Sequence, residues 1–425
     1  MRKENQALYQ QLRKDYPEFV YEGYHYEVSE EGVSMQFFYS AGADVRFAPK
    51  MKLLWNKYKS ADFQLDKIDG LVFHIGLIEL ISYWKCVCSP LVRVKPYRLS
   101  EAQQQWWKKL YRKGLGEFFY QNTIQPDKEH FLDFVFEEDA ADASVLAYQR
   151  VLDGDTTLVP IGGGKDSVVT LESLKAAGRR IVPFIINPRG ATLDCARIAG
   201  FPEPQDIVIL HREIDPFLLE LNSRGYLNGH TPFSAMLAFY SLLVASCTGI
   251  REVALSNESS ANEPTIPGTD INHQYSKSLE FEEDFRSYVA TYMNDVAHYY
   301  SYLRPLTELQ IAERFARYPA YFKVFKSCNA GSKQNIWCCR CSKCLFAYII
   351  LSPFINKETM VSIFGEDLLD NWDMKTYFDE LTGIAEVKPF ECVGTVDEVN
   401  KALQMVLAQR QDAQLLRYYQ KMLNC

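Results

Sequence analysis

The chain has 425 residues, of which 47% are hydrophobic and 14% aromatic, and its formal net charge is −8. This composition excludes extensive disorder, and the length is sufficient for two or three domains with at least one sizeable α/β core. A negative net charge gives no electrostatic basis for binding a large polyanion such as tRNA or DNA, so no nucleic-acid partner is expected.

Residues 1–153 are expected to form a separate N-terminal α+β region. Alternating residues at 24–39 predict strands that are interrupted at Glu30-Glu31-Gly32, and the segments 71–87 and 101–120 predict helices. The charged start of the chain contains no apolar signal segment. Export is therefore not expected, and the predicted location is the cytoplasm.

Residues 154–325 alternate between predicted strands and helices. Strands are predicted at 157–161, 181–186, 206–210 and 252–255, and helices at 168–177 and 191–199. This alternation predicts a parallel sheet covered by helices, with ligands at the carboxyl ends of the strands. The uncharged stretch 231–250 is nearly long enough to span a bilayer, but it contains Pro232 and several hydroxyl residues. A buried helix is therefore predicted, and no membrane partner is expected.

A glycine-rich loop follows the first of these strands and consists of Gly162, Gly163, Gly164, Lys165, Asp166 and Ser167. Glycines let the backbone approach an anion closely, and the N–H groups of the following helix point at that anion. Lys165 adds positive charge, Asp166 can hold Mg²⁺, and Ser167 adds a hydroxyl group. The pattern predicts a site for nucleotide phosphates, and the alternative is a glycine-rich turn without a ligand.

The spacing of the loop excludes two common glycine motifs. The Walker A pattern requires a glycine where Val159 stands and Ser or Thr at position 166, and the dinucleotide fingerprint requires a glycine at position 167. The loop instead resembles the pyrophosphatase loop of the ATP α-hydrolase families, with Gly162 in place of the usual first serine. Pro305-Leu306-Thr307-Glu308 resembles a later element of these families, and Thr307 is a predicted helix N-cap.

The resemblance implies a Rossmann-like parallel sheet of the ATP α-hydrolase type. It also implies binding of ATP and Mg²⁺, with cleavage between the α and β phosphates.

A cluster of cysteines marks the C-terminal region, residues 326–425, which is expected to hold a metal knuckle and helices. Two interlocked Cys-x-x-Cys steps and a cysteine ten residues upstream can close a thiolate tetrahedron around Zn²⁺. The four ligands would be Cys328, Cys338, Cys341 and Cys344. Such a closed site predicts a structural zinc, and Cys339 is expected to point away from it. The alternatives are a group of reduced, buried cysteines and a redox pair.

The loop and the knuckle together resemble the 7-cyano-7-deazaguanine synthases, which activate a carboxylate with ATP. Longer strings between about residues 70 and 355, however, resemble the UDP-N-acetylmuramoyl-L-alanyl-L-glutamate epimerases. These strings are Gly114-Leu115-Gly116-Glu117-Phe118, Pro160 to Ser167, Asn228-Gly229-His230, Ser256-Asn257-Glu258, Asn272 to Ser278, Ser327-Cys328-Asn329 and Trp337-Cys338.

The epimerase resemblance implies a specific reaction in the synthesis of peptidoglycan precursors. The terminal L-glutamate of the UDP-linked muramoyl dipeptide would be converted to D-glutamate, while ATP is cleaved to AMP and pyrophosphate. Adenylation turns a carboxylate into a mixed anhydride, whose α-proton is far more acidic than that of the carboxylate. A base can then remove this proton from one face, and an acid can return a proton on the other.

The implied chemistry needs an acid/base pair and cations for an anionic substrate. His230 and His273 are the predicted pair, because neutral imidazole is suited to proton transfer near pH 7, and Glu258 and Lys277 are further candidates. The predicted substrate-binding cations are Arg189, Arg212 and Arg304. Loop histidines that cap backbone groups and arginines in ordinary salt bridges are the alternatives.

The sequence is also compatible with two other function classes. One is an ATP-dependent ligase or nucleobase-modifying synthase, which would consume ammonia or an amine stoichiometrically. The other is a nucleotide-binding regulatory module without catalysis.

Overall fold

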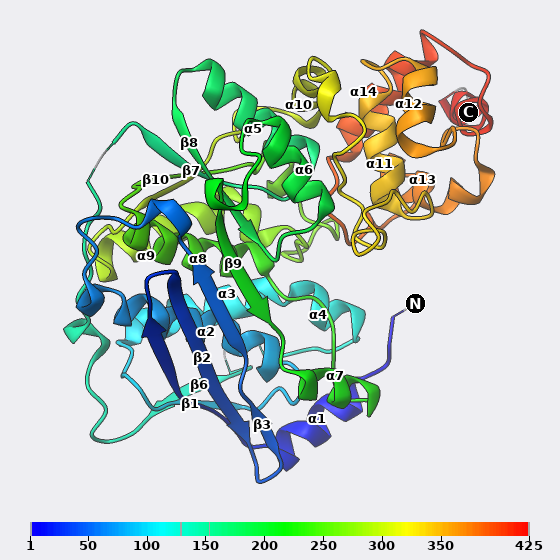
Figure 1. The fold of residues 1–425 in the computed structure, drawn as a ribbon. Coiled ribbons are helices and arrows are strands. Elements are labelled where there is room, and N and C mark those ends of the chain that lie inside the picture. Colours follow the sequence, from blue (N-terminus) through cyan, green and yellow to red (C-terminus); the bar gives the residue numbers. More distant parts are fainter. Residues whose placement is uncertain (1, 128–129, 153, 424–425) are drawn as a thin grey trace. The chain divides into compact units, whose positions relative to one another are not determined.

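The computed structural model describes residues 2–127, 130–152 and 154–423. Asp153, where the N-terminal region is expected to end, and Cys425 therefore lie outside the described residues. The chain forms two compact units (Figure 1). Unit 1 comprises Met1–Thr156, Val208–Val253 and Asp270–Tyr299, and unit 2 comprises Thr157–Ile207, Ala254–Thr269 and Tyr300–Cys425. The division of the sequence at 153 and 325 stays a prediction.

Unit 1 combines a mixed sheet with helices. Its strands are β1 (Glu18–Val28), β2 (Gly32–Ala41), β3 (Val45–Phe47), β4 (Lys50–Leu54), β5 (Leu91–Val94), β6 (Asp133–Phe136) and β9 (Val208–Glu213). Its helices are α1 (Gln6–Asp15), α2 (Asp69–Trp84), α3 (Glu101–Gly114), α4 (Gly116–Gln121), α7 (Pro216–Ser223), α8 (Phe233–Thr248) and α9 (Leu279–Tyr292).

The strand order in unit 1 is β9-β4-β2-β1-β5-β6, with β3 paired to β2. Strands β1, β2, β3, β4 and β9 pair in antiparallel fashion, whereas β5 pairs in parallel with both β1 and β6. The antiparallel register places Lys52 of β4 opposite His211 of β9. The sequence correctly predicts the strands around Glu30-Glu31-Gly32 and at 206–210. The antiparallel partner of β9 is a finding that the expectation of a parallel sheet did not include.

Two apolar helices form the centre of unit 1. Helix α2 is buried along almost its whole length and packs against α8, β1 and β2. The stretch 231–250 is the buried helix α8, as predicted, and it ends at Gly249 in the left-handed conformation. Among the described residues, no helix is both long and apolar enough to cross a membrane.

A buried polar network inside unit 1 centres on Tyr288. Its hydroxyl oxygen accepts hydrogen bonds from Gln103 and Trp107, each at 3.1 Å, and can donate its own proton to His74 Nε2 at 3.0 Å. The other ring nitrogen of His74 donates to the carbonyl of Gly70 at 2.7 Å. This arrangement suits only the neutral imidazole, and burial lowers the pKa of His74 to about 4.

We expect the free energy of unfolding to fall as the pH is lowered from about 6.5 toward 4. In this window the unfolded chain protonates His74 while the folded protein keeps it neutral, so stability decreases by roughly 1.4 kcal/mol per pH unit for this group. Urea unfolding of the wild type and of His74→Gln at several pH values measures the effect. The variant should show the shallower pH dependence, and equal slopes would contradict this account.

Unit 2 contains the glycine loop and the cysteine cluster. Its sheet order is β11-β10-β7-β8, where β7, β10 and β11 each cross the unit boundary along the chain. These strands are β7 (Thr156–Pro160), β8 (Arg180–Ile186), β10 (Glu252–Leu255) and β11 (His298–Ser301). The helices are α5 (Lys165–Ala176), α6 (Gly190–Ile198), α10 (Glu308–Phe315), α11 (Ser342–Leu351), α12 (Lys357–Phe364), α13 (Lys375–Thr382), α14 (Val396–Leu407) and α15 (Gln414–Leu423).

The element order of unit 2 confirms the predicted strand, loop and helix around residue 162. Helix α5 connects the neighbouring strands β7 and β8, a connection typical of parallel strands. Helix α5 also packs against α10, and Thr307 caps α10 by accepting a hydrogen bond from the N–H of Gln310, as predicted. The fold class of the whole chain is mixed α/β.

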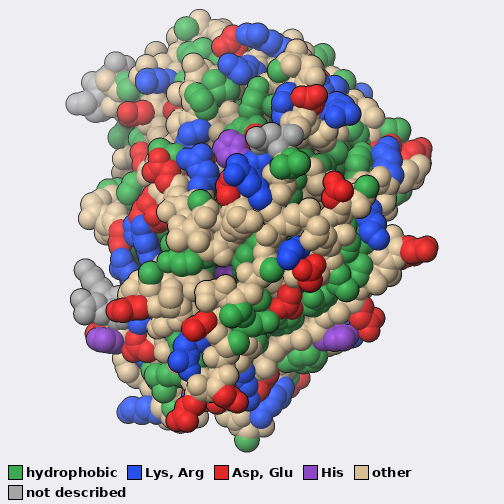
Figure 2. All heavy atoms as spheres, turned by 90° about the vertical axis from the view of Figure 1, so that its left-hand side faces the viewer, with side chains coloured by type: hydrophobic (Ala, Val, Ile, Leu, Met, Phe, Trp, Pro, Cys, Tyr) green, Lys and Arg blue, Asp and Glu red, His purple; other side chains and the backbone are tan. Residues whose placement is uncertain are grey.

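Acidic and basic side chains are interspersed on the face shown in Figure 2.

Candidate functional site

The glycine loop lies between the end of β7 and the first turn of α5. Gly163 adopts a φ of +81°, and a Cβ atom there would lie 3.0 Å from the backbone of Ala191, so this position favours glycine for two reasons. Gly164 is the N-cap of α5, and no side chain caps this helix. The N-cap residue therefore offers no side-chain acceptor to the first-turn N–H groups, and such a helix end binds phosphate groups in other proteins.

Lys165 lies between two carboxylates at the start of α5. Its ammonium group is 2.5 Å from Asp166 Oδ1 and 2.5 Å from Glu308 Oε2, and Lys165 and Glu308 are both buried. Burial lowers the pKa of Lys165, but the two carboxylates outweigh this effect and raise the pKa overall. The sequence predicts Lys165 as a positive charge of the loop, and the structure adds that this charge is paired with two carboxylates. The physical reason is that the cap at Thr307 places Glu308 in the first turn of α10.

Glu258 adds a third carboxylate to this region of unit 2. Burial raises the pKa of Glu308, and the negative charges of Asp166 and Glu258 raise it further against the opposing effect of Lys165. Glu258 itself is buried and accepts a hydrogen bond from the hydroxyl of Ser260 at 3.2 Å. Three carboxylates and one ammonium therefore interact beside the glycine loop, and this oxygen-rich set has the donor chemistry that Mg²⁺ prefers.

The predicted substrate cations occupy different environments in the two units. Arg304 donates to the backbone oxygen of Glu258 at 2.7 Å, and exposed Arg189 donates to the hydroxyl of Ser332 at 2.9 Å, both within unit 2. Arg212, in unit 1, forms two bonds of 2.8 Å with the buried carboxylate of Glu79. The carboxylate of Glu79 thus neutralises the charge of the Arg212 guanidinium group, and this does not favour a substrate-binding role for Arg212.

The structure brings His230 and His273 of unit 1 together around one carboxylate. The Nδ1 atoms of His273 and His230 lie 2.5 Å and 3.2 Å from the same oxygen, Glu117 Oε2. An ionised carboxylate only accepts hydrogen bonds, so Nδ1 of His273 is assigned as the donor, which leaves its Nε2 as the proton acceptor in the neutral ring. Nδ1 of His230 lies within ion-pair distance of the same oxygen. Glu117 belongs to the first turn of α4. The sequence contains a recognisable motif around Glu117, but the motif does not predict that the Glu117 carboxylate contacts His230 and His273.

The local backbone explains why His230 occupies this position. The side chain of Asn122 donates to the carbonyl of Asn228 at 3.1 Å. A Cβ atom on Gly229 would lie 3.1 Å from the ring of Phe118, so the turn before His230 has little room for a side chain. His230 is thus presented by an anchored loop that leads into α8.

The separation of the two imidazoles constrains their chemistry. Their ring centroids are 4.6 Å apart and the ring planes are inclined by 50°. Reacting atoms in a near-attack geometry lie about 3–3.5 Å apart, so two bases on opposite faces of one carbon are roughly 6–7 Å apart. The centroid separation is shorter than this distance, which is compatible with both imidazoles lying on one face of a substrate.

The four predicted cysteines of unit 2 converge. The Sγ separations are 3.9 Å for Cys328 and Cys341, 3.7 Å for Cys338 and Cys344, and 3.5 Å for Cys341 and Cys344. Four thiolates at about 2.3 Å from a tetrahedral zinc are about 3.8 Å apart, so the observed separations fit such an ion. Cys339 points away, as predicted, and donates to the carbonyl of Phe364 at 3.0 Å.

We expect about one zinc per chain in protein purified without a chelator. The closed set of four thiols has no position for a further ligand, so the ion should be structural, and Cys344→Ser should lose most of it. Inductively coupled plasma mass spectrometry measures the stoichiometry, and Cys247→Ser, in buried helix α8, is a matched control. Metal-free wild-type protein with all four thiols titratable in the native state would contradict the prediction.

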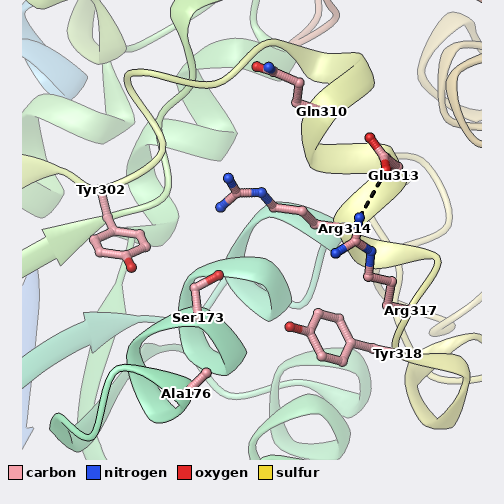
Figure 3. A pocket seen from close by; sticks show the side chains of 8 residues that line it. All are labelled: Ser173, Ala176, Tyr302, Gln310, Glu313, Arg314, Arg317 and Tyr318. Atoms are coloured by element: carbon pink, nitrogen blue, oxygen red, sulfur yellow. Dashed lines mark hydrogen bonds and ion pairs between the residues drawn. The ribbon is translucent and has the colours of Figure 1, made fainter.

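A separate open cavity of about 510 Å³ lies along α5 and α10. Its lining includes Ser173 of α5, Arg314 of α10 and Tyr302, and Figure 3 shows the side chain of Arg314 extending toward Tyr302. Arg317 pairs with Glu313 at 2.9 Å on the same wall. None of the glycine-loop residues lines this cavity, so cavity size alone does not identify the predicted phosphate site.

The geometry defines a mixed α/β protein with a phosphate-type glycine loop, a histidine pair on one carboxylate and a four-cysteine cluster. The family models of the MurL N-terminal domain and the MurL C-terminal domain match residues 10–302 and 324–424. The chain belongs to the MurL family.

Three curated relatives share the name UDP-N-acetyl-alpha-D-muramoyl-L-alanyl-L-glutamate epimerase. The protein from a Micromonospora species is 37% identical, with 81% of this chain and 76% of the relative aligned. The protein from Xanthomonas oryzae pv. oryzae is also 37% identical, covering 79% and 74%. The protein from Salinispora tropica is 33% identical, covering 91% and 84%.

Proposed function

We propose that this chain is an isomerase that epimerises the terminal L-glutamate of UDP-N-acetylmuramoyl-L-alanyl-L-glutamate in an ATP-dependent reaction of peptidoglycan precursor synthesis. The observation that carries this proposal is the similarity over most of the chain to three relatives named as this epimerase. Because ATP and a UDP-linked substrate are both required, we expect the enzyme to act in the cytoplasm.

In this proposal the glycine loop binds ATP. Gly162, Gly163 and Gly164 allow the backbone to approach the phosphates, and the first turn of α5 supplies N–H donors together with the hydroxyl of Ser167. Lys165 offsets phosphate charge while it stays paired with Glu308. The loop context supports nucleotide cleavage between the α and β phosphates, in a unit of the ATP α-hydrolase type.

Two metal ions fit the chemistry of the residues present. Asp166 would hold Mg²⁺, with Glu258 and Glu308 as neighbouring carboxylates, and the ion would supply charge stabilisation for the leaving pyrophosphate. The four cysteines would hold a structural Zn²⁺ in a C-terminal knuckle, with separations of 3.5–3.9 Å supporting the assignment.

The first chemical step activates the substrate. An oxygen of the α-carboxylate of the terminal glutamate attacks the α-phosphorus of ATP, and the bond to pyrophosphate breaks. The product is an acyl-adenylate, in which the α-carbon bears a more acidic proton because the ionised carboxylate is now an anhydride. Only activation of this carboxylate, and not of the side-chain carboxylate, acidifies the α-proton directly.

Proton transfer then inverts the α-carbon. Nε2 of a neutral histidine beside Glu117 accepts the α-proton, and Glu117 stabilises the imidazolium that results. Because the rings of His230 and His273 are 4.6 Å apart, we propose that they act as one unit on one face. Lys277, four residues beyond His273, is our candidate for the opposite face. Hydrolysis of the inverted acyl-adenylate releases the product and AMP.

Incubation with ATP, Mg²⁺ and the UDP-linked muramoyl dipeptide, followed by chiral analysis of the released glutamate, tests the proposal. D-glutamate should accumulate only when ATP is present. Exclusive recovery of L-glutamate would contradict the epimerase, and stoichiometric incorporation of an added amine or ammonia would indicate a ligase.

A further inference from the structure

Lys85 is a buried lysine whose charge the chemistry above does not use. It directly follows α2, is 6% exposed, and extends its side chain to the loop that carries His230. Its ammonium group donates to the carbonyl oxygen of Gly229 and, at 2.6 Å, to the hydroxyl oxygen of Thr231. These residues immediately precede and follow His230, so one side chain holds both neighbours of the histidine.

Lys85 places its ammonium group in a buried environment, which is energetically costly, and this cost indicates that its hydrogen bonds to Gly229 and Thr231 have a function. Among the described residues, no carboxylate lies within ion-pair distance of its ammonium group, and burying an unpaired charge is costly. Burial and the positive charge of Arg212 together lower the pKa of Lys85 to about 8, against the smaller opposing effect of the Glu117 carboxylate. The hydrogen bonds to Gly229 and Thr231 compensate in part for this burial.

We propose that Lys85 is a positioning residue that fixes His230 in the orientation needed for proton transfer. It acts through the backbone and hydroxyl group on either side of the histidine and does not itself contact the substrate. This inference rests on the proposed function for its catalytic consequence. The inference also predicts that Lys85 fixes the orientation of His230 and lowers its pKa, and this part can be tested without a substrate.

The charges around His230 support the same role. Glu117 of α4 and His273 lie in contact with it, Lys85 extends from the end of α2, and Arg212 of β9 is paired with Glu79. Burial, together with the charges of His273 and Lys85, lowers the pKa of His230 to about 3. A positive Lys85 therefore helps to keep His230 neutral, which is the form that accepts a proton.

Lys85→Met tests the proposal, because methionine retains an apolar side chain of similar length without the charge or the donors. We expect the pKa of His230 to rise by roughly one unit when the nearby positive charge is removed. Histidine NMR of the full-length protein measures this change, with His230→Gln assigning the signal. The acidic limb of the epimerisation pH profile should shift to higher pH, since the base becomes protonated earlier.

Activity separates positioning from general stability. Epimerisation by Lys85→Met should fall by about a hundredfold, while AMP formation stays within a few-fold of the wild type. Thr231→Val removes one of the two acceptors and should cause a smaller loss with the same selectivity. Lys108→Met, which removes a lysine paired with Asp133 elsewhere in unit 1, is the matched control and should leave both rates unchanged.

Two results would overturn the inference. One is an unchanged His230 pKa together with unchanged epimerisation in Lys85→Met and Thr231→Val. The other is an equal loss of AMP formation and epimerisation without a change in the pH profile, which would indicate a structural role only. Failure of the proposed function is distinct, because the wild type itself would then not epimerise the substrate, while the NMR titration would still report on Lys85.

Discussion

Replacing Asp166 with asparagine is expected to reduce Mg²⁺-dependent formation of AMP from ATP by a factor of about a hundred or more. The substitution keeps the size of the side chain but removes the negative charge that would hold the metal beside the leaving pyrophosphate. Asp166 is a better probe than Lys165, because loss of Lys165 would leave Glu308 buried without its cationic partner. Chromatography of the products of ATP labelled at the α-phosphate measures the rate.

The matched control is Glu172→Gln. Glu172 lies on the same helix, α5, but pairs with Lys175 away from the loop, so its neutralisation should leave AMP formation near the wild-type rate. ADP and inorganic phosphate as the wild-type products would contradict cleavage between the α and β phosphates. Retention of full activity by Asp166→Asn would remove this residue from the proposed metal site.

The second large effect concerns the histidine pair. His230→Ala, His273→Ala and Glu117→Gln should each slow epimerisation by roughly 10²–10⁴-fold, because general acid/base catalysis commonly contributes this factor. AMP formation should fall much less, since adenylation precedes proton transfer. In D₂O the wild-type product should carry deuterium at the glutamate α-carbon, because the proton returned to the opposite face comes from a group, proposed as Lys277, whose protons exchange with solvent.

His298→Ala is the appropriate control for these substitutions. His298 also lies beside a carboxylate, with Nδ1 at 3.1 Å from Glu252, but it belongs to β11 and is not part of the cluster around Glu117. Its loss should change epimerisation little. If both His230→Ala and His273→Ala epimerise normally, the histidines are not the base, and Lys277 or Glu258 becomes the next candidate.

Local patterns in the sequence predict the elements that carry the candidate site. The glycine loop, the N-cap at Thr307, the buried helix at 231–250 and the cysteine cluster each depend on residues that are close in sequence, and the structure contains all four features. Capping, glycine conformation and Cys-x-x-Cys spacing are local physical constraints, so a single sequence is sufficient to recognise them.

Contacts between distant residues were not predictable in this way. Lys165 meets Glu308 across 143 positions, and Glu117 meets His273 across 156 positions. Such pairs depend on how helices pack, and no local pattern encodes that packing. The pairing of Arg212 with Glu79 shows the same limit, since an arginine at the end of a strand resembles a ligand-binding residue until its buried partner is known.

The most direct test of carboxylate activation is transfer of an oxygen atom. The dipeptide substrate is prepared with ¹⁸O in the α-carboxylate of its terminal glutamate and is incubated with ATP and Mg²⁺ until D-glutamate forms. If the carboxylate attacks the α-phosphorus and water later attacks the acyl carbon, mass spectrometry should find ¹⁸O in AMP and none in pyrophosphate. Epimerised product together with AMP that contains no ¹⁸O would contradict an acyl-adenylate hydrolysed at carbon.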